Sequence, residues 1–249
     1  MRKKFNEKSF FKSSLVLLGI VMIFYAVSSI ILFYLGPLMP QRTESVVSNK
    51  NNVSMLTNMS ALYEENPDIV GWIKIEGTVI DYPVMYTKDD GEFYLYRNFY
   101  KNKDVNGSIF LDEHCTMDPF STNLLLHGHN MNNGSMFGAL MKYKSQDFYN
   151  SHKRILFDTL YENQVYEIIS VFKSKVYNVS DNVFKYYKFY NAKNKEEFKD
   201  FVDNIKRLSL YDTGVTARYG DKFITLSTCE NSTPNGRFVV VAKKIKEVD

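Results

Sequence analysis

The chain has 249 residues, of which 45% are hydrophobic and 15% aromatic, with 31 basic residues against 28 acidic ones. These proportions are those of one sizeable folded domain with an appendage, and they exclude a disordered chain, a collagen-like repeat and a disulfide scaffold. Residues 1–14 carry a net charge of +4, so the rest of the chain sums to −1 and offers no electrostatic surface for nucleic acid.

An uncharged apolar segment follows this basic tail. Residues 15–35 contain no charge, and as a helix they are long enough to span the roughly 30 Å hydrocarbon core of a bilayer. The segment is too long for a cleaved signal peptide, and its flanks are not those of a buried core helix, so we expect an uncleaved signal anchor over residues 15–36. The excess of basic residues before it places residues 1–14 in the cytoplasm and the following domain outside the cell, on a single-pass anchor in the cell membrane. Residues 41–53 are polar and show no apolar periodicity, so residues 37–53 are predicted to form a stalk.

The remaining residues, 54–249, are predicted to form one mostly β domain with inserted helices. Eight runs rich in Val, Ile, Phe, Tyr and Thr predict strands at 69–75, 78–84, 107–111, 123–127, 154–160, 165–172, 222–228 and 237–245. Apolar residues on one helical face predict a helix at 195–208, between the sixth and seventh strands, and a weaker helix is expected at 54–65. Eight strands fit a closed barrel or a sandwich, and composition does not choose between them.

The chain contains two cysteines, Cys115 and Cys229, which outside a cell could form one structural disulfide. The context of Cys229 favours a reactive thiol instead. Cys229 follows a predicted strand and Arg237 opens the next one, so we expect the two side chains side by side on adjacent strands, where the cation favours the thiolate and binds a developing oxyanion. The alternative for Arg237 is an ion pair with an acid such as Glu230. Cys115, in a predicted loop, is expected to be free and dispensable.

A cysteine nucleophile needs a base, most often a histidine, and the chain has four: His114, His127, His129 and His152. His127 and His129 flank Gly128 at the end of a predicted strand and point to the same face, so spacing alone does not decide between them. A His-x-His pair is compatible with a metal ion, but no further residues at metal-ligand spacing accompany it, so neither a metal nor another cofactor is expected. The context of His152 indicates a solvated or capping role.

The sequence around Cys229 reads TLSTC at 225–229, followed by RFVVVAK at 237–243. These strings resemble the active-site signature of sortases, the membrane-anchored cysteine transpeptidases of Gram-positive bacteria. Further strings resemble the class B subgroup in particular: NPDIVGWI at 66–73, IDYPV at 80–84, GSIFLD at 107–112, GHNM at 128–131 and GSMFG at 134–138. The resemblance covers about residues 54–247, nearly the whole domain.

The resemblance implies an eight-stranded sortase-type β-barrel with an N-terminal helix and a helix between strands six and seven. It also implies a catalytic site of three residues. Cys229 would be the nucleophile, His129, which follows Gly128, the general acid/base, and Arg237 the residue that steadies substrate and oxyanion.

Substrate contacts implied by the resemblance fall on Leu95 and on Ser227, two residues before the cysteine. Tyr186 and Tyr187 are expected to line the groove ahead of the inserted helix, with aromatic packing as the alternative. The chain departs from the family pattern at Gly91, where an Asn is common, and at His127, where a Tyr usually precedes the Gly-His pair. These departures concern the preference for a sorting signal rather than the chemistry.

The resemblance further implies an activity and its partners. A C-terminal sorting signal of secreted surface proteins would be cleaved after Thr through a thioacyl intermediate, and the Thr would be joined to an amine of a lipid-linked peptidoglycan precursor. Two alternatives remain. A hydrolytic membrane-anchored cysteine protease would use the same residues with water as the acceptor, and a non-enzymatic surface binding module would not need a Cys, a His and an Arg in these settings.

Overall fold

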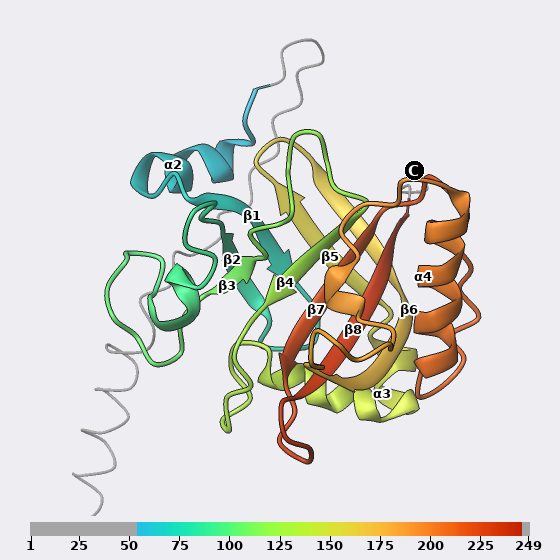
Figure 1. The fold of residues 1–249 in the computed structure, drawn as a ribbon. Helices are drawn as coiled ribbons and strands as arrows, with labels where there is room; N and C mark the ends of the chain where they lie inside the picture. Colours follow the sequence, from blue (N-terminus) through green and yellow to red (C-terminus); the bar gives the residue numbers. More distant parts are fainter. Residues whose placement is uncertain (1–53, 246–249) are drawn as a thin grey trace, which may run out of the picture. The chain divides into compact units, whose positions relative to one another are not determined.

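Eight strands close into a barrel in the order β1-β2-β3-β4-β7-β8-β6-β5 (Figure 1). The computed structural model describes residues 54–245. The strands are β1 (Ile69–Lys74), β2 (Asp81–Met85), β3 (Ile109–Leu111), β4 (Asn123–His127), β5 (Arg154–Thr159), β6 (Asn163–Lys175), β7 (Phe223–Cys229) and β8 (Gly236–Ile245). The expectation of a mostly β domain with eight strands is confirmed, and the sheet is a closed barrel rather than a sandwich.

The barrel brings β4 and β7 together as parallel neighbours, although they are far apart in the chain. Their ladder ends at the pair His127↔Ser227, so both strands finish at the same end of the barrel. β8 runs antiparallel to β7 and therefore begins at that end, where Arg237 pairs with Cys229. The loop after β4 and the loop between β7 and β8 consequently lie together, at the lower end of the barrel in Figure 1.

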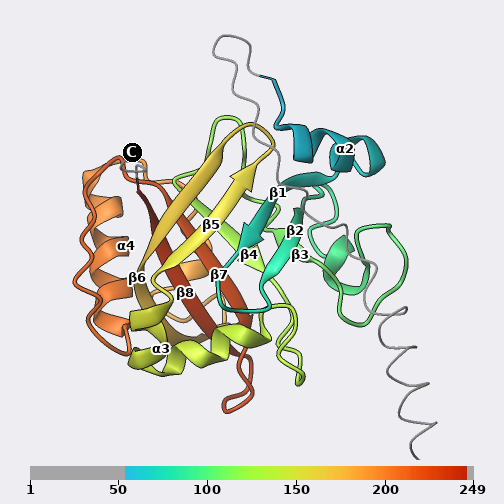
Figure 2. The same ribbon diagram turned by 180° about the vertical axis from the view of Figure 1, so that it is seen from behind.

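The helix α4 (Lys195–Leu208) lies along the outside of the barrel beside β6, as Figures 1 and 2 both show. Its bounds coincide with the helix predicted at 195–208, because its apolar residues recur at helical spacing. At its N-terminus the Asn194 side chain accepts a hydrogen bond from the Glu197 amide, and acidic residues in the first turn and basic residues in the last complement the helix dipole. The face against the barrel buries Phe198, Phe201, Val202 and Ile205.

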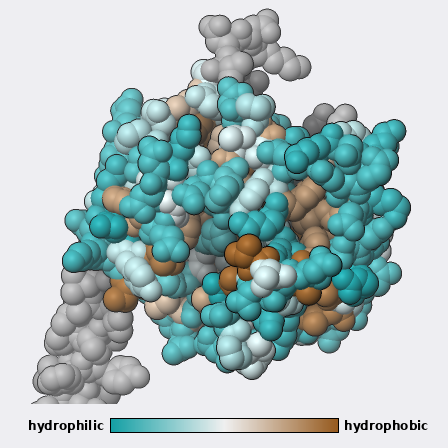
Figure 3. Space-filling view, viewed as in Figure 1, coloured by the Kyte–Doolittle hydropathy of each residue, from teal (hydrophilic) through white to brown (hydrophobic). Residues whose placement is uncertain are grey.

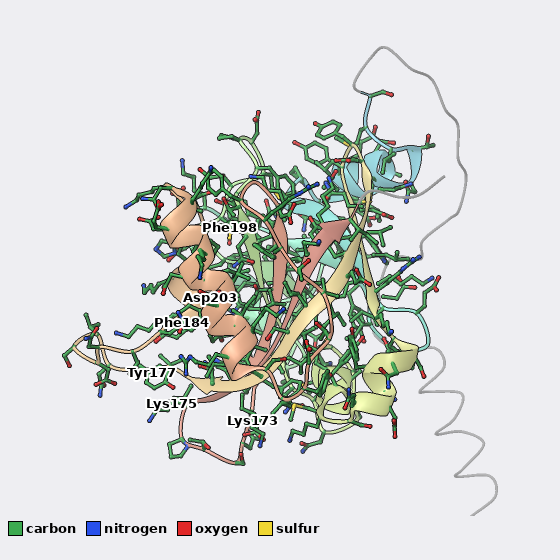
Figure 4. The ribbon with its side chains drawn as sticks, turned by 90° about the vertical axis from the view of Figure 1, so that its right-hand side faces the viewer. Lys173, Lys175, Tyr177, Phe184, Phe198 and Asp203 are labelled. Carbon is green, nitrogen blue, oxygen red and sulfur yellow. The ribbon has the colours of Figure 1, made fainter. Side chains whose placement is uncertain are left out.

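The segment between β6 and α4 extends away from the barrel between Tyr177 and Phe184 (Figure 4). It carries Val179, which is 98% exposed. The chain then returns to the barrel in the short helix η3 (Tyr186–Lys188), in which Tyr186 is buried. This return places η3 ahead of α4 and against the end of β7, because the Tyr186 hydroxyl is hydrogen-bonded to Ser227.

Shorter helices cover other parts of the barrel. The expected N-terminal helix is α2 (Thr57–Glu65), which begins three residues later than predicted and contacts β1. Three further short helices were not predicted, because segments of four to seven residues are too short to show helical periodicity. These are η1 (Phe93–Tyr96), η2 (Gly138–Lys144) and α3 (Gln146–Ser151).

The strand predicted at 78–84 begins later than expected, at Asp81. Gly77 adopts a φ of +73°, and the Thr78 hydroxyl donates to the Ile75 carbonyl at 2.7 Å, so these residues form the turn between β1 and β2. β3 likewise begins at Ile109 rather than at residue 107. Gly107, at a φ of +59°, ends the turn that precedes β3, and its amide donates to the Asp104 carbonyl at 3.1 Å.

Within residues 54–245, no helix is long and apolar enough to cross a membrane. The expected basic tail at 1–14, signal anchor at 15–36 and stalk at 37–53 lie outside the described residues, as do residues 246–249. These three segments therefore stay predictions.

Candidate active site

Cys229 is the last residue of β7 and stands directly opposite Arg237 in the antiparallel ladder with β8. Opposed residues project from the same face of a sheet, with Cβ atoms about 4.5–5.5 Å apart. Cys229 is exposed, whereas the six residues before it in β7 are buried. A rigid strand thus presents the thiol at the surface beside a guanidinium, which is the placement expected from the sequence.

His129 follows β4 at the same end of the barrel. Because the β4–β7 ladder ends at His127↔Ser227, His129 and Cys229 each stand two residues beyond the same pair. Nε2 of His129 lies 2.8 Å from the Leu95 carbonyl oxygen. A carbonyl oxygen only accepts hydrogen bonds, so Nε2 carries a proton and Nδ1 is the ring nitrogen left for proton exchange.

One cavity of about 730 Å³ is lined by Cys229, His129 and Arg237. Figure 3 draws the face of the molecule that carries β7 and β8, where mostly hydrophilic residues are interrupted by hydrophobic ones in several places. The cavity is also lined by the four residues expected to contact substrate: Leu95, Ser227, Tyr186 and Tyr187. The fold therefore brings together the three expected catalytic residues and the four expected substrate contacts.

Tyr186 and Ser227 form a buried pair in the wall of this cavity. Each is 2% exposed, and the two hydroxyl oxygens are 2.7 Å apart. Burial raises the pKa of Tyr186 to about 12, so its phenol stays neutral at physiological pH. Tyr187 is partly exposed, and its hydroxyl accepts a hydrogen bond from the Tyr177 amide at 2.9 Å. Both tyrosines line the cavity, and both also pack against aromatic rings. Lining the groove and aromatic packing, the two alternatives from the sequence, are therefore both correct.

Leu95 has a role that sequence reasoning missed, since its main-chain carbonyl is hydrogen-bonded to His129. Its partly buried side chain packs against the hydrophobic cluster around Met59 and Trp72, which fixes the residue from the other side. Gly107 lies behind the same carbonyl, at a φ of +59°. A Cβ atom there would come within 2.2 Å of the Leu95 oxygen. Only a glycine at position 107 therefore allows the Leu95 carbonyl to lie where it accepts the hydrogen bond from His129.

Glu230, which follows the cysteine, does not serve as the partner of Arg237 that the sequence left open. Its carboxylate, in a side chain 5% exposed, lies 3.1 Å from Lys144 Nζ and 3.2 Å from Lys173 Nζ. The Ser232 hydroxyl also donates to it, and together with the lysines this bond lowers the pKa of Glu230 to about 2 despite burial. Two lysines thus neutralise the acid, and Arg237 is not needed for that purpose.

Asp112 joins two histidines on another wall of the cavity and was not identified from the sequence. Its carboxylate oxygens lie 2.9 Å from His127 Nε2 and 2.9 Å from His114 Nδ1. Burial alone would raise the pKa of Asp112, but the hydrogen bonds from His127 and His114 outweigh it and lower this pKa to about 2. His127 is therefore held by a carboxylate and His129 by a main-chain carbonyl, a difference that spacing could not reveal. The available signal was an acid directly after the strand predicted at 107–111.

Comparison with known proteins identifies the family of the chain. The sortase domain matches residues 73–245. The chain belongs to the sortase family. Sortase B of Staphylococcus aureus is 33% identical over 208 residues, covering 83% of this chain and 82% of that protein. Sortase B of Listeria monocytogenes is 32% identical over 205 residues, covering 82% of this chain and 80% of that protein.

Solved structures agree with this assignment. The Staphylococcus aureus sortase B–substrate complex superimposes with a TM-score of 0.69 at 35% identity, covering 78% of this chain and 87% of that one. This sortase is therefore a cysteine transpeptidase of the sortase B type. The recognition of a class B sortase from the TLSTC and GHNM strings is confirmed.

Gly91, which was singled out from the sequence, lies beside Glu113 in the cavity wall. Gly91 and Glu113 both line the cavity. A Cβ atom at position 91 would lie 2.8 Å from Glu113 Oε2. The Glu113 carboxylate therefore occupies the space that a side chain at position 91 would need.

Cys115 and His152 do not line the cavity. Cys115 is buried and free, which confirms the expectation of a free thiol, and Cys229 is also free, so the alternative of a structural disulfide is wrong. Burial raises the pKa of Cys115 to about 12, and the Leu125 amide donates to its sulfur at 3.4 Å. The His152 ring stacks on Phe148 at 4.0 Å, and His152 caps the C-terminus of α3, so its capping role is confirmed.

Proposed function

We propose that this sortase acts outside the cell, held in the membrane by a single anchor at 15–36 with its N-terminus in the cytoplasm. Its substrates are C-terminal sorting signals of secreted proteins, which it cleaves after Thr through a thioacyl bond to Cys229. The Thr is then joined to an amine of a lipid-linked peptidoglycan precursor. The observation that supports this best is the direct opposition of Cys229 and Arg237 in the ladder, in one cavity with His129.

In the first half of the reaction, the Cys229 thiolate attacks the Thr carbonyl carbon. Negative charge develops on the carbonyl oxygen, and the Arg237 guanidinium beside the thiol stabilises it. His129 as imidazolium gives its Nδ1 proton to the leaving amine, and the C-terminal fragment departs. A thioester between Cys229 and Thr remains.

In the second half, the acceptor amine attacks the thioester carbon. Neutral His129 takes a proton from the amine at Nδ1, and the Cys229 thiolate leaves. Nε2 carries a proton in both charge states of the ring, so the hydrogen bond to the Leu95 carbonyl persists through the cycle. This carbonyl therefore keeps the ring oriented while Nδ1 gains and loses its proton.

A membrane anchor would bring the enzyme close to both of its proposed substrates. Both partners of the proposed reaction are present at the membrane, the secreted protein as it emerges and the acceptor through its lipid. Tethering the enzyme there raises the effective concentration of each. Within the cavity, we assign the peptide to the wall formed by Leu95, Ser227, Tyr186 and Tyr187, which adjoins the catalytic residues.

A peptide library tests the proposal. The full chain is incubated with the peptides, with and without a panel of primary amines, and the products are identified by mass spectrometry. Cleavage after Thr, with the Thr joined to an amine when one is present, is the expected result. Cleavage that yields a free Thr carboxylate at the same rate with and without every amine would identify a hydrolytic protease instead. No cleavage and no labelling of Cys229 by a thiol-directed peptide analogue would indicate a binding module.

A further inference from the structure

Side-chain hydrogen bonds continue the alignment of β4 and β7 beyond the end of their ladder. The Gly128 amide donates to the Ser227 carbonyl at 3.3 Å. Past this bond, the Thr228 hydroxyl donates to the Gly128 carbonyl at 2.7 Å. In the opposite direction, Asn130 Nδ2 donates to the Cys229 carbonyl at 2.9 Å. The two segments that carry the proposed nucleophile and acid/base are thus joined by one bond from each side.

We propose that Asn130 is a positioning residue that sets the place of Cys229 relative to His129. Asn130 follows His129 in the chain, and its side chain binds the main chain of Cys229, so one residue connects both segments. Thr228 performs the same task on Gly128, the residue before His129. The inference rests on the proposed function in taking Cys229 and His129 as the reacting pair.

The main chain around Asn130 is also bound to the chain that returns at residues 136–138, which restricts the position of Asn130. The Phe137 amide donates to the His129 carbonyl at 2.9 Å, and Asn130 forms a β-bridge with Met136. Gly138 brings the returning chain close, because a Cβ atom there would lie 2.6 Å from the Met131 carbonyl oxygen. A loop closed on itself in this way fixes where the Asn130 amide points.

A bond of this kind matters more for rate than for stability. A single neutral hydrogen bond at a partly exposed position contributes little to the free energy of unfolding. Proton transfer and attack, in contrast, require the reacting atoms within a few tenths of an ångström, and a displacement of about 1 Å can lower the rate about 100-fold. The loss of the Asn130 amide should therefore reduce turnover in a protein that remains folded.

The experiment compares Asn130→Ala and Asn130→Asp with Asn132→Ala and Asn132→Asp in the full chain. Aspartate has nearly the shape of asparagine, but its ionised carboxylate has no hydrogen to donate. Asn132 is exposed in the same loop and provides the matched control for charge and for truncation. The probe is the peptide that the wild type cleaves fastest in the library above. Turnover is normalised to the amount of Cys229 that iodoacetamide alkylates, and a thermal melt follows folding.

We expect kcat to fall about 10- to 100-fold in both Asn130 variants, with KM changed less than about 2-fold and Tm nearly unchanged. Both Asn132 variants should behave as the wild type. Thr228→Ser should keep activity and Thr228→Val should lose it, because serine retains the hydroxyl.

Wild-type kcat in Asn130→Asp would overturn the inference, as would a loss confined to KM or an equal loss in Asn132→Asp. If Asn130→Ala melts early, Asn130→Asp alone decides. The proposed function fails separately, when Cys229→Ala or His129→Ala cleaves the peptide as fast as the wild type.

Discussion

Cys229 and Arg237 are the last pair in the ladder between β7 and β8, so a thiol and a guanidinium lie on neighbouring strands at the same end of the barrel. Arg237 Nη1 donates to the Gly236 carbonyl at 3.0 Å, which ties the guanidinium to its own strand. Glu230, the acid in the intervening loop, is paired with Lys144 and Lys173. Among residues 54–245 no acid pairs with Arg237, so the remaining donors of the guanidinium are available to a substrate oxygen.

This arrangement predicts that Arg237→Lys does not rescue Arg237→Ala. A guanidinium presents a planar fork of donors, whereas an ammonium is a flexible point charge. The loss of one well-placed oxyanion donor costs about 10² to 10³ in turnover, and we expect the effect mainly in kcat. Steady-state kinetics and a thermal melt of both variants provide the measurement. An arginine that only stabilised the fold would give variants that melt earlier but turn over normally.

Substitution of His129 and substitution of His127 should have opposite effects on activity. His129→Ala should lose about 10² to 10⁴ in the rate of acyl transfer, as expected for a missing general acid/base. His127→Tyr should keep most activity, because His127 is bound to Asp112 and not to the Leu95 carbonyl that orients His129. Single-turnover rates with one sorting-signal peptide test both variants. A reversed order would exchange the roles of the two residues.

The histidines also show where sequence reasoning succeeds and where it stops. The strand at 123–127 and the helix at 195–208 were predicted with the bounds that the structure has, because their patterns are local. The contacts that distinguish His127 from His129 are not local. Asp112 lies 15 residues before His127, and the Leu95 carbonyl lies 34 residues before His129. Every residue type has a main-chain carbonyl, so no sequence pattern could have indicated that the Leu95 carbonyl binds His129.

A similar limit applies to β6, which extends three residues beyond the predicted end at 172. Lys173, Ser174 and Lys175 are polar, but they pair with the start of β8, from Phe238 to Gly236. The partner strand, and not the local composition, keeps them extended. The position of Arg237 opposite Cys229 could be predicted, because a short loop joins the two strands and the register follows from it.

Cys115 is predicted to be dispensable. It is buried, its thiol remains protonated at physiological pH because burial raises its pKa to about 12, and it does not line the cavity. Cys115→Ser should therefore retain activity, with a loss of stability of about 1 kcal/mol, which is typical for a small change at a buried site. Kinetics and a thiol count under denaturing conditions test this. A disulfide to Cys229 in the active protein, or an inactive serine variant, would contradict it.

Asp112 predicts a pH dependence of stability. Its folded-state pKa of about 2 lies below the ordinary 3.8, so it contributes stability above pH 4 that is lost as the pH falls through about 2. Asp112→Asn should lower the free energy of unfolding by about 2 kcal/mol at pH 6. The difference from the wild type should shrink between about pH 4 and 2, which thermal melts across that range can measure. A difference that stays constant down to pH 2 would show that the carboxylate does not act through its charge.

The central claim is that Cys229 forms a covalent bond with the substrate, and intact-mass spectrometry tests it most directly. The full chain is mixed with a cleavable sorting-signal peptide in the absence of amine and quenched in acid within one turnover. We predict an adduct on Cys229 with the mass of the peptide up to and including Thr, which disappears when amine is added before the quench. Cys229→Ala should melt as the wild type does but form no adduct and cleave no peptide. Cleavage by Cys229→Ala above about a tenth of the wild-type rate, far more than the loss of a nucleophile leaves, would contradict the account.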